Sequence, residues 1–170
     1  MEQRDQVGVR ILHTALELLR ARGPRAVTMQ AITEATGIAK TTIYRRHRDR
    51  RALLTAALAG LVLDVPMPDD TDRDERLRWA ITQSVDVIAN GIGAGGFAAL
   101  LTGEDPEFSE VFRAILTGHR RQAIDALGAD DRDGDTLIDM IVGSYVAERA
   151  RTGTIDDGWA DRVFAVLRRS

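Results

Sequence analysis

Six positive charges gather within twelve residues around Tyr44, between Lys40 and Arg51, and Asp49 is the only acid among them. Guanidinium and ammonium groups bind anions, above all the phosphates of nucleic acids. Because like charges in a short folded segment repel one another, such a cluster persists when an anion lies opposite or when its face is simply solvated. The cluster therefore predicts a phosphate-binding surface, with an ordinary solvated basic face as the alternative.

The charge distribution sets this cluster apart from the rest of the chain. The 170-residue sequence has a net charge of −3, yet residues 1–55 hold eleven Lys and Arg against five Asp and Glu. A basic unit joined to an acidic one suits a nucleic-acid binder with a separate sensing or pairing domain, because only one face should attract phosphate. With no run of about 18 uncharged apolar residues and no export signal, we expect a soluble, cytoplasmic protein without membrane contact.

The residue types disfavour several classes of site. Cysteine is absent and His13, His47 and His119 lie far apart, so we expect no disulfide, metal site or cofactor. The glycine run Gly91–Gly96 follows a predicted helix rather than a strand and lacks a Lys-Ser/Thr ending, which disfavours a nucleotide-binding loop. The acidic segment Asp130–Asp135 lacks the glutamate of a calcium loop and is expected to cap a helix.

Three helical patterns in the first fifty residues position the basic cluster. Apolar residues recur at helical spacing over residues 4–22, and Gly23-Pro24 ends that helix. Thr28 is placed to cap a short second helix, which Gly37 ends. A third helix follows, with Ile43 facing inward and the polar residues facing outward. Two short helices braced by a longer one predict a helix-turn-helix, whose second helix fits the DNA major groove.

The rest of the chain also has helical patterns, so the predicted fold class is all-α. These patterns cover residues 51–63, 72–88, 106–127, 137–146 and 159–167. Pro66 and Pro68 are expected to end the first of them, and the glycine run is expected to break the chain after the second. We therefore expect a helix-turn-helix domain over residues 1–50 and a helical ligand-binding and dimerisation domain over residues 51–170.

The last two helical patterns each carry an apolar stripe. The expected interface residues on these stripes are Leu137, Ile141, Tyr145, Trp159, Val163 and Leu167. Two adjacent amphipathic helices either complete a core or pair with a second copy in a four-helix interface. Pairing is favoured, because a helix-turn-helix normally needs two copies to read enough bases. We therefore expect a homodimer.

The stretch from Thr28 to Leu54 resembles the DNA-binding domain of the TetR family of transcriptional regulators. A second stretch, from Leu137 to Gly153, is similar to one group of ligand-binding domains in that family. The resemblance implies an all-helical homodimer that represses transcription from a palindromic operator and releases it when a small molecule enters the C-terminal domain. The positions that match the family's operator contacts are Thr28, Gln30, Lys40, Thr41, Thr42, Tyr44, Arg46 and Arg50.

These expected contacts fall into two groups, those to base edges and those to phosphates. Side chains expected at base edges are those of Lys40, Thr41, Thr42 and Arg46, and those expected at phosphates are Thr28, Tyr44, Arg48 and Arg50. The chain departs from the family at His47, where relatives usually carry an apolar residue, and at Arg48–Arg51, which is more basic than the usual Pro-Ser-Lys-Glu. The first departure affects packing, and the second makes the phosphate-facing end more positive.

A ligand site is expected in the C-terminal domain. Its candidate lining residues are Trp79, Gln83, Asp86, Phe97, Phe112, His119 and Met140. Such a mixed lining suits an apolar or amphipathic small molecule. An Asp and a His in one cavity could also perform acid–base chemistry, but nothing in the sequence fixes their spacing, so we expect no enzyme. An activator or a ligand-independent regulator of the same fold is the alternative to a repressor, and a helical adaptor would leave the basic cluster unexplained.

Overall fold

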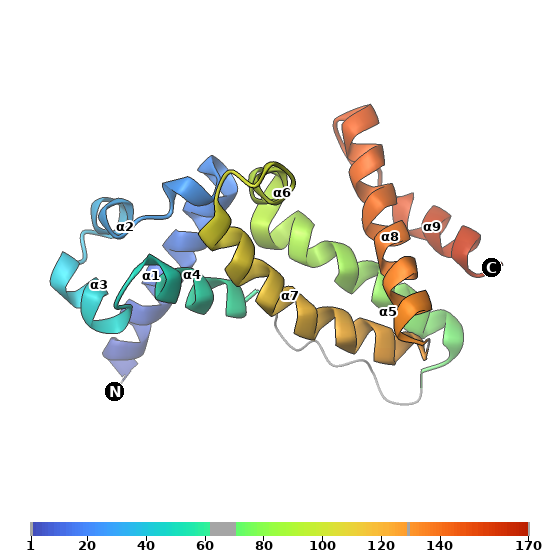
Figure 1. The fold of residues 1–170 in the computed structure, drawn as a ribbon, viewed down its shortest axis with the longest axis horizontal. Helices are drawn as coiled ribbons and strands as arrows, with labels where there is room; N and C mark the ends of the chain where they lie inside the picture. Colours follow the sequence, from blue (N-terminus) through green and yellow to red (C-terminus); the bar gives the residue numbers. More distant parts are fainter. Residues whose placement is uncertain (1, 62–70, 129, 170) are drawn as a thin grey trace. The chain divides into compact units, whose positions relative to one another are not determined.

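The computed structural model describes residues 2–61, 71–128 and 130–169, which form helices joined by turns and include no strand (Figure 1). The expected all-α fold is confirmed. The chain divides into two compact units, Met1–Leu63 with Ile88–Leu116 and Asp64–Val87 with Thr117–Ser170. The boundary expected after residue 50 does not coincide with this division. The expected helix end at Pro66 and Pro68 lies outside the described residues.

The first unit opens with the expected helix-turn-helix. Its elements are α1 (Glu2–Arg22), the 3-10 helix η1 (Pro24–Ala26), α2 (Met29–Thr36), α3 (Lys40–Arg46) and α4 (Arg50–Ala59). Thr28 Oγ1 accepts a hydrogen bond from the Ala31 N–H at 3.1 Å, which caps α2 as expected. Gly37 ends α2 in the left-handed region at φ 69°, and Asp49 caps α4 through the Ala52 N–H. Local chemistry therefore sets where each helix begins and ends.

The core of the helix-turn-helix is built from aliphatic side chains on each helix. Ile11, Ile32, Ile43 and Leu53 are fully buried, and Leu19 is 1% exposed. Helix α1 packs against α2, α4 and α6, and α2 packs against α3. This apolar contact fixes α3 from one side, so the opposite side of α3 remains at the surface.

The glycine run does not interrupt the helical structure, so the expected break is wrong. A π-helical turn, η2 (Val87–Ile92), leads directly into α6 (Gly93–Thr102). Close packing explains the glycines: a Cβ at Gly95 would lie 3.6 Å from Gly23 Cα, and one at Gly96 would lie 2.8 Å from Ile92 Cβ. Arg20 Nε also donates to the Gly91 carbonyl at 2.8 Å. The small residues allow α6 to lie close to the end of α1.

One helical stretch, Arg73–Thr102, is long and apolar enough by length and composition to cross a membrane. The expectation that no such run exists is therefore not confirmed. A single helix of this kind is weak evidence, because core helices of soluble proteins meet the same criterion. Both parts of the stretch have packing partners: α5 contacts α8 and α9 in one unit, and α6 contacts α1 in the other.

The second unit is helical throughout its described residues. Its elements are α5 (Arg73–Asp86), the second half of α7 (Pro106–Leu127), α8 (Asp131–Thr152) and α9 (Trp159–Leu167). Asp72 and Glu75 form a capping box that begins α5, and Asp130 caps α8 as the acidic segment predicts. Ion pairs join neighbouring helices, including Arg120–Asp135 at 2.7 Å and Arg162–Glu148 at 2.9 Å.

Candidate nucleic-acid interface

The outward side of α3 presents polar and basic side chains to solvent. Lys40, Thr41 and Arg45 are exposed, and Tyr44 is 45% exposed although it is a large aromatic residue. Lys40 Nζ lies 5.9 Å from the centre of the Tyr44 ring, which orders the two side chains on one face. Ile43 faces the opposite way and is fully buried. Helix α3 therefore has one apolar face that anchors it and one face free to meet a partner.

Three further predicted contact residues lie on α2, its cap or α3. Thr28 is half-buried and its hydroxyl is engaged in the α2 cap, so it marks the N-terminal end of that helix. Gln30 is exposed and donates to Glu34 at 2.7 Å. Thr42 is half-buried on α3. Because α2 packs against α3, the structure brings these positions into the same unit as the exposed face of α3.

The segment after α3 carries Arg46, His47 and Arg48. Arg46 is exposed, and its Nη1 comes 3.2 Å from where a Cβ on Gly8 of α1 would stand. The Arg48 side chain is 87% exposed and pairs with its neighbour Asp49 at 3.2 Å. His47 is half-buried, and burial, followed by the nearby charge of Arg46, lowers its pKa below 6.5, while a backbone contact at Ala52 acts in the opposite direction. A half-buried polar ring therefore follows directly after the last residue of α3.

Arg50 is placed differently from the prediction. Its guanidinium donates to the carbonyls of Val27 and Pro24, each at 2.8 Å, and to the carboxylates of Asp105 and Glu107. Only 23% of the Arg50 side chain is exposed. An arginine with four protein acceptors has little capacity left for phosphate, so we withdraw Arg50 from the expected DNA contacts. Its role is to fix the start of α4 to the turn that precedes α7.

Asp105 is the acid that completes this arrangement. It is 6% exposed, and its Oδ1 also accepts the Phe108 N–H at 3.1 Å at the start of α7. Burial acts to raise the pKa of Asp105, but the hydrogen bonds from Arg50 and Phe108 outweigh it and hold the pKa below 3.8. The carboxylate is therefore ionised at neutral pH and matches the Arg50 charge.

The basic cluster thus divides into two parts. Arg50 and Arg51 meet acids on α7 or just before it, Arg51 through Glu110 at 2.8 Å. Lys40 and Arg45 remain on the outer face of α3, and neither has an ion-pair partner within the described part of the chain. Arg45 was absent from the expected contact set, although its place in the cluster and on the polar side of α3 was a signal for it.

Comparison with known proteins decides the family. Residues 11–57 match the sequence model of the bacterial regulatory proteins of the tetR family. An uncharacterised HTH-type transcriptional regulator of Mycobacterium tuberculosis, MT1294 in strain CDC 1551 and Rv1255c in strain H37Rv, is 30% identical over 132 residues. This match covers 72% of the chain and 63% of the relative. The chain belongs to the TetR family.

A second relative supports the same assignment over a shorter region. Another uncharacterised HTH-type transcriptional regulator of M. tuberculosis, MT2310 or Rv2250c in the same two strains, is 32% identical over 73 residues, which cover 43% of the chain and 39% of the relative. The chain spans less than two thirds of the length of these relatives. The family match over residues 11–57 includes α2 and α3, so the exposed face of α3 lies within the matched helix-turn-helix.

The expected ligand-site residues of this TetR-family chain do not line one described pocket. Phe97 and Phe112 belong to the first unit, where Phe112 is 3% exposed and packs beside Phe108 at 5.9 Å. In the second unit, Asp86 and Met140 are exposed, and Gln83 and Trp79 are half-buried. His119 is 8% exposed, and neither of its ring nitrogens has a hydrogen-bond partner within the described residues. Phe112 and His119 are therefore buried in different units, whereas Asp86 and Met140 lie at the surface.

The expected dimer residues of the TetR-family chain lie mostly inside the second unit. Ile141 is fully buried, Trp159 is 5% exposed, and Leu167 is 6% exposed. Tyr145 is 9% exposed and meets Trp159 edge to face, with ring centres 5.4 Å apart. Leu137 and Val163 are half-buried. The apolar stripes complete the core of their own chain, because α5 needs them as a packing surface.

Other side chains of α8 and α9 remain at the surface. Met140 is 51% exposed and Val166 is 62% exposed. Both border a groove of about 240 Å³ between α8 and α9, together with Ser144 and Val163. An apolar groove of this kind is a better candidate for pairing with a second copy than the buried residues expected from the sequence.

Proposed function

We propose that this TetR-family protein is a repressor that binds a palindromic operator as a homodimer and releases it when a small molecule binds to the second unit. The observation that carries the DNA-binding part is the outward face of α3, where Lys40, Thr41, Tyr44 and Arg45 are exposed. We expect Lys40, Thr41 and Thr42 to address base edges, and Tyr44, Arg45 and Arg48 to hold phosphates. Thr28, Gln30 and Arg46 complete the expected surface. The protein would act in the cytoplasm, where its DNA target is found.

Dimerisation supports this function because one recognition helix reads too few base pairs to be selective. We place the pairing surface at the exposed groove of α8 and α9, with Met140 and Val166 as its apolar contacts. A two-fold axis through such a surface presents the same residues from both copies. Two recognition helices related by that axis would then match a palindromic DNA site.

The test of this function is a selection of bound sequences from a randomised duplex library by the purified protein. We expect an enriched palindrome whose half-sites are about one helical turn apart, roughly 34–36 Å centre to centre. A transcription assay from a promoter that carries the enriched sequence then separates a repressor from an activator. If the selection enriches no sequence, or only a single half-site, the dimeric repressor is wrong.

A further inference from the structure

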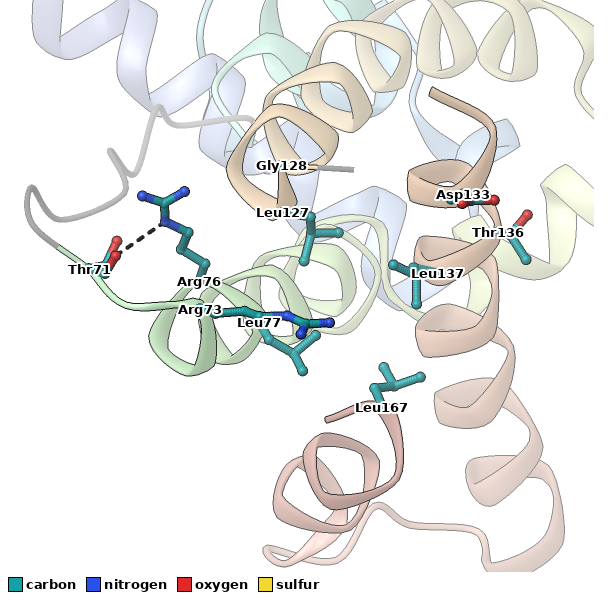
Figure 2. A pocket seen from close by; sticks show the side chains of 10 residues that line it. All are labelled: Thr71, Arg73, Arg76, Leu77, Leu127, Gly128, Asp133, Thr136, Leu137 and Leu167. Carbon is teal, nitrogen blue, oxygen red and sulfur yellow. Dashed lines mark hydrogen bonds between the residues drawn. The ribbon is translucent and has the colours of Figure 1, made fainter. Parts of the chain in front are cut away.

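A pocket of about 860 Å³ lies within the second unit, among α5, the end of α7, the start of α8 and the end of α9 (Figure 2). Four leucines, one from each helix, give it apolar walls: Leu77, Leu127, Leu137 and Leu167. Its volume is within the range of roughly 300–1,000 Å³ that is typical of small-molecule sites. The pocket therefore has room for an apolar chain, and none of the expected ligand residues lines it.

Two arginines of the first turns of α5 also line this pocket. Arg76 Nε donates to the Thr71 carbonyl at 3.2 Å, which directs that side chain. Arg73 has no hydrogen-bond or ion-pair partner within the described ranges. Figure 2 shows the Arg73 side chain extending past Leu77 toward the other leucines. One side of the pocket thus combines positive charge with apolar surface.

Thr71 contributes a second polar feature. Its Oγ1 is buried and has no hydrogen-bond partner among the residues that the structure describes. A buried hydroxyl without a partner costs stability, so an acceptor atom on a ligand would satisfy it. The hydroxyl and the two guanidinium groups come from neighbouring positions at the start of α5. Figure 2 shows Arg76 directed toward Thr71 and Arg73 directed toward the leucines, so donors border the pocket in two places along the start of α5.

The acidic groups near these donors are engaged or lie on another helix. Asp74 pairs with Arg168 at 3.0 Å, and Glu75 accepts the Asp72 N–H at 3.1 Å within the capping box. Asp133 lines the pocket from α8, on a different side from the arginines of α5 (Figure 2). The lining therefore has two guanidinium groups against one carboxylate, and this balance favours a ligand with one negative charge.

We propose that this pocket binds an amphipathic carboxylate, an elongated apolar molecule that ends in one acidic group. The carboxylate would pair with Arg73, with Arg76 and the Thr71 hydroxyl as further donors at the start of α5, and the chain would lie among the leucines. A cationic ligand would face two guanidinium groups, and an uncharged ligand would gain no ion pair from them. Effects of this ligand on DNA rest on the function proposed above, whereas binding in the pocket does not.

Calorimetric titration of the full chain with decanoate and with decan-1-ol tests the proposal. The two probes share a ten-carbon chain and differ in the anionic group. We expect decanoate to bind more tightly, and Arg73→Gln and Arg76→Gln each to weaken decanoate about tenfold while binding of decan-1-ol stays unchanged. Arg149→Gln is the matched control, because Arg149 is an exposed arginine of the same unit that does not line the pocket.

Each outcome has a definite meaning. Equal binding of the two probes, no binding of either, or Arg73→Gln and Arg76→Gln variants that bind decanoate like the wild type would overturn the site. Operator affinity measured with and without decanoate is a separate readout. Decanoate that binds as expected but leaves operator affinity unchanged would support the pocket and contradict ligand release. If the protein fails to bind operator DNA even without decanoate, the proposed function is contradicted, whereas the calorimetric evidence for the pocket is unaffected.

Discussion

The guanidinium of Arg50 holds both oxygens of Asp105, with Nη1 donating to Oδ1 at 3.2 Å and Nη2 donating to Oδ2 at 2.5 Å. The same guanidinium also donates to the carbonyls of Pro24, the first residue of η1, and of Val27, the residue that follows η1. One side chain at the start of α4 therefore joins three segments of the first unit. Removal of either partner would leave a buried charge without its counterion, so we expect this pair to matter for the stability of the first unit.

Replacing Arg50 should reduce stability rather than act on DNA selectivity. Arg50→Ala leaves the buried Asp105 carboxylate without its cation and two carbonyls without a donor, so we expect a loss of about 3 kcal/mol in the free energy of unfolding. Urea denaturation measures this loss. Arg51→Ala is the control, because its pair with Glu110 is exposed and should matter little. Equal stability of the two variants would contradict the structural role of Arg50.

The outer face of α3 should account for DNA affinity. If Arg45 neutralises a phosphate, Arg45→Ala lowers affinity for operator and random DNA alike, and the slope of log affinity against log salt falls by about 0.9 for every phosphate that this side chain neutralises in each subunit. If Lys40 reaches a base edge, Lys40→Ala instead costs about 1–3 kcal/mol on the preferred site and little on a site altered at that base pair. Fluorescence anisotropy over a salt series distinguishes the two.

The control for both variants is Arg22→Ala, which removes an exposed positive charge from the last turn of α1. We expect it to change affinity less than Arg45→Ala at every salt concentration. If all three variants bind every DNA like the wild type, the cluster around Tyr44 is only a solvated face.

His47 should make stability depend on pH. Its pKa is lowered in the folded protein, so the folded state binds fewer protons than the unfolded state when the pH falls below about 6.5. Stability is therefore unaffected by this group at higher pH and decreases as the pH falls through 6.5 toward the lowered value. His47→Phe should remove that decrease and hold or raise stability near pH 8. Thermal unfolding of the wild type and of His47→Phe at about pH 8 and about pH 5.5 measures this decrease. An equal decrease in the two proteins would contradict the role of His47.

The exposed groove of α8 and α9 gives a test of pairing. Val166→Asp should shift the protein from dimer to monomer in sedimentation velocity, because a charge would be buried without a partner. Leu101→Asp is the matched control, since Leu101 is 73% exposed on α6. A wild type that is monomeric at micromolar concentration would contradict dimerisation. A Val166→Asp protein that stays dimeric would show that the interface lies elsewhere.

Two glycines in helices offer a matched pair for the packing of α6. Gly96→Ala places a Cβ 2.8 Å from Ile92 Cβ, so we expect overpacking to cost about 1–3 kcal/mol. Gly118→Ala on α7 meets no atom within 4 Å and should stabilise the helix by roughly 0.5–1 kcal/mol. Opposite changes in the midpoint of urea unfolding are the expected result.

Local chemistry made much of the fold predictable. The cap at Thr28, the left-handed Gly37 and the inward Ile43 define α2 and α3 through contacts within a few residues, so the helix-turn-helix followed from the sequence. The same holds for Asp130, which caps α8. Such signals depend on near neighbours in the chain and need no knowledge of tertiary packing.

The errors arose where a distant partner decides the role of a residue. Arg50 looked like a phosphate ligand because the acids that meet it are 55 and 57 residues away. The glycine run looked like a break because its reason, the close approach of Gly95 to Gly23, depends on packing against the end of α1. Trp159 packs within its own unit at 5% exposure, and the sequence could not show this because an apolar stripe has the same spacing whether it meets its own chain or another.

The hydrogen bonds and ion pairs of Arg50 also limit which segments of this protein could be exchanged with those of a related regulator. A hybrid that joins residues 1–60 of this chain to the remainder of a relative would place Arg50 opposite foreign side chains in the turn before α7. A hybrid that also keeps residues 88–116 of this chain retains Asp105, Glu107 and Glu110, the acids with which Arg50 and Arg51 pair. The compact unit that contains the helix-turn-helix is therefore discontinuous in sequence, and it is longer than the segment 11–57 that matches the family.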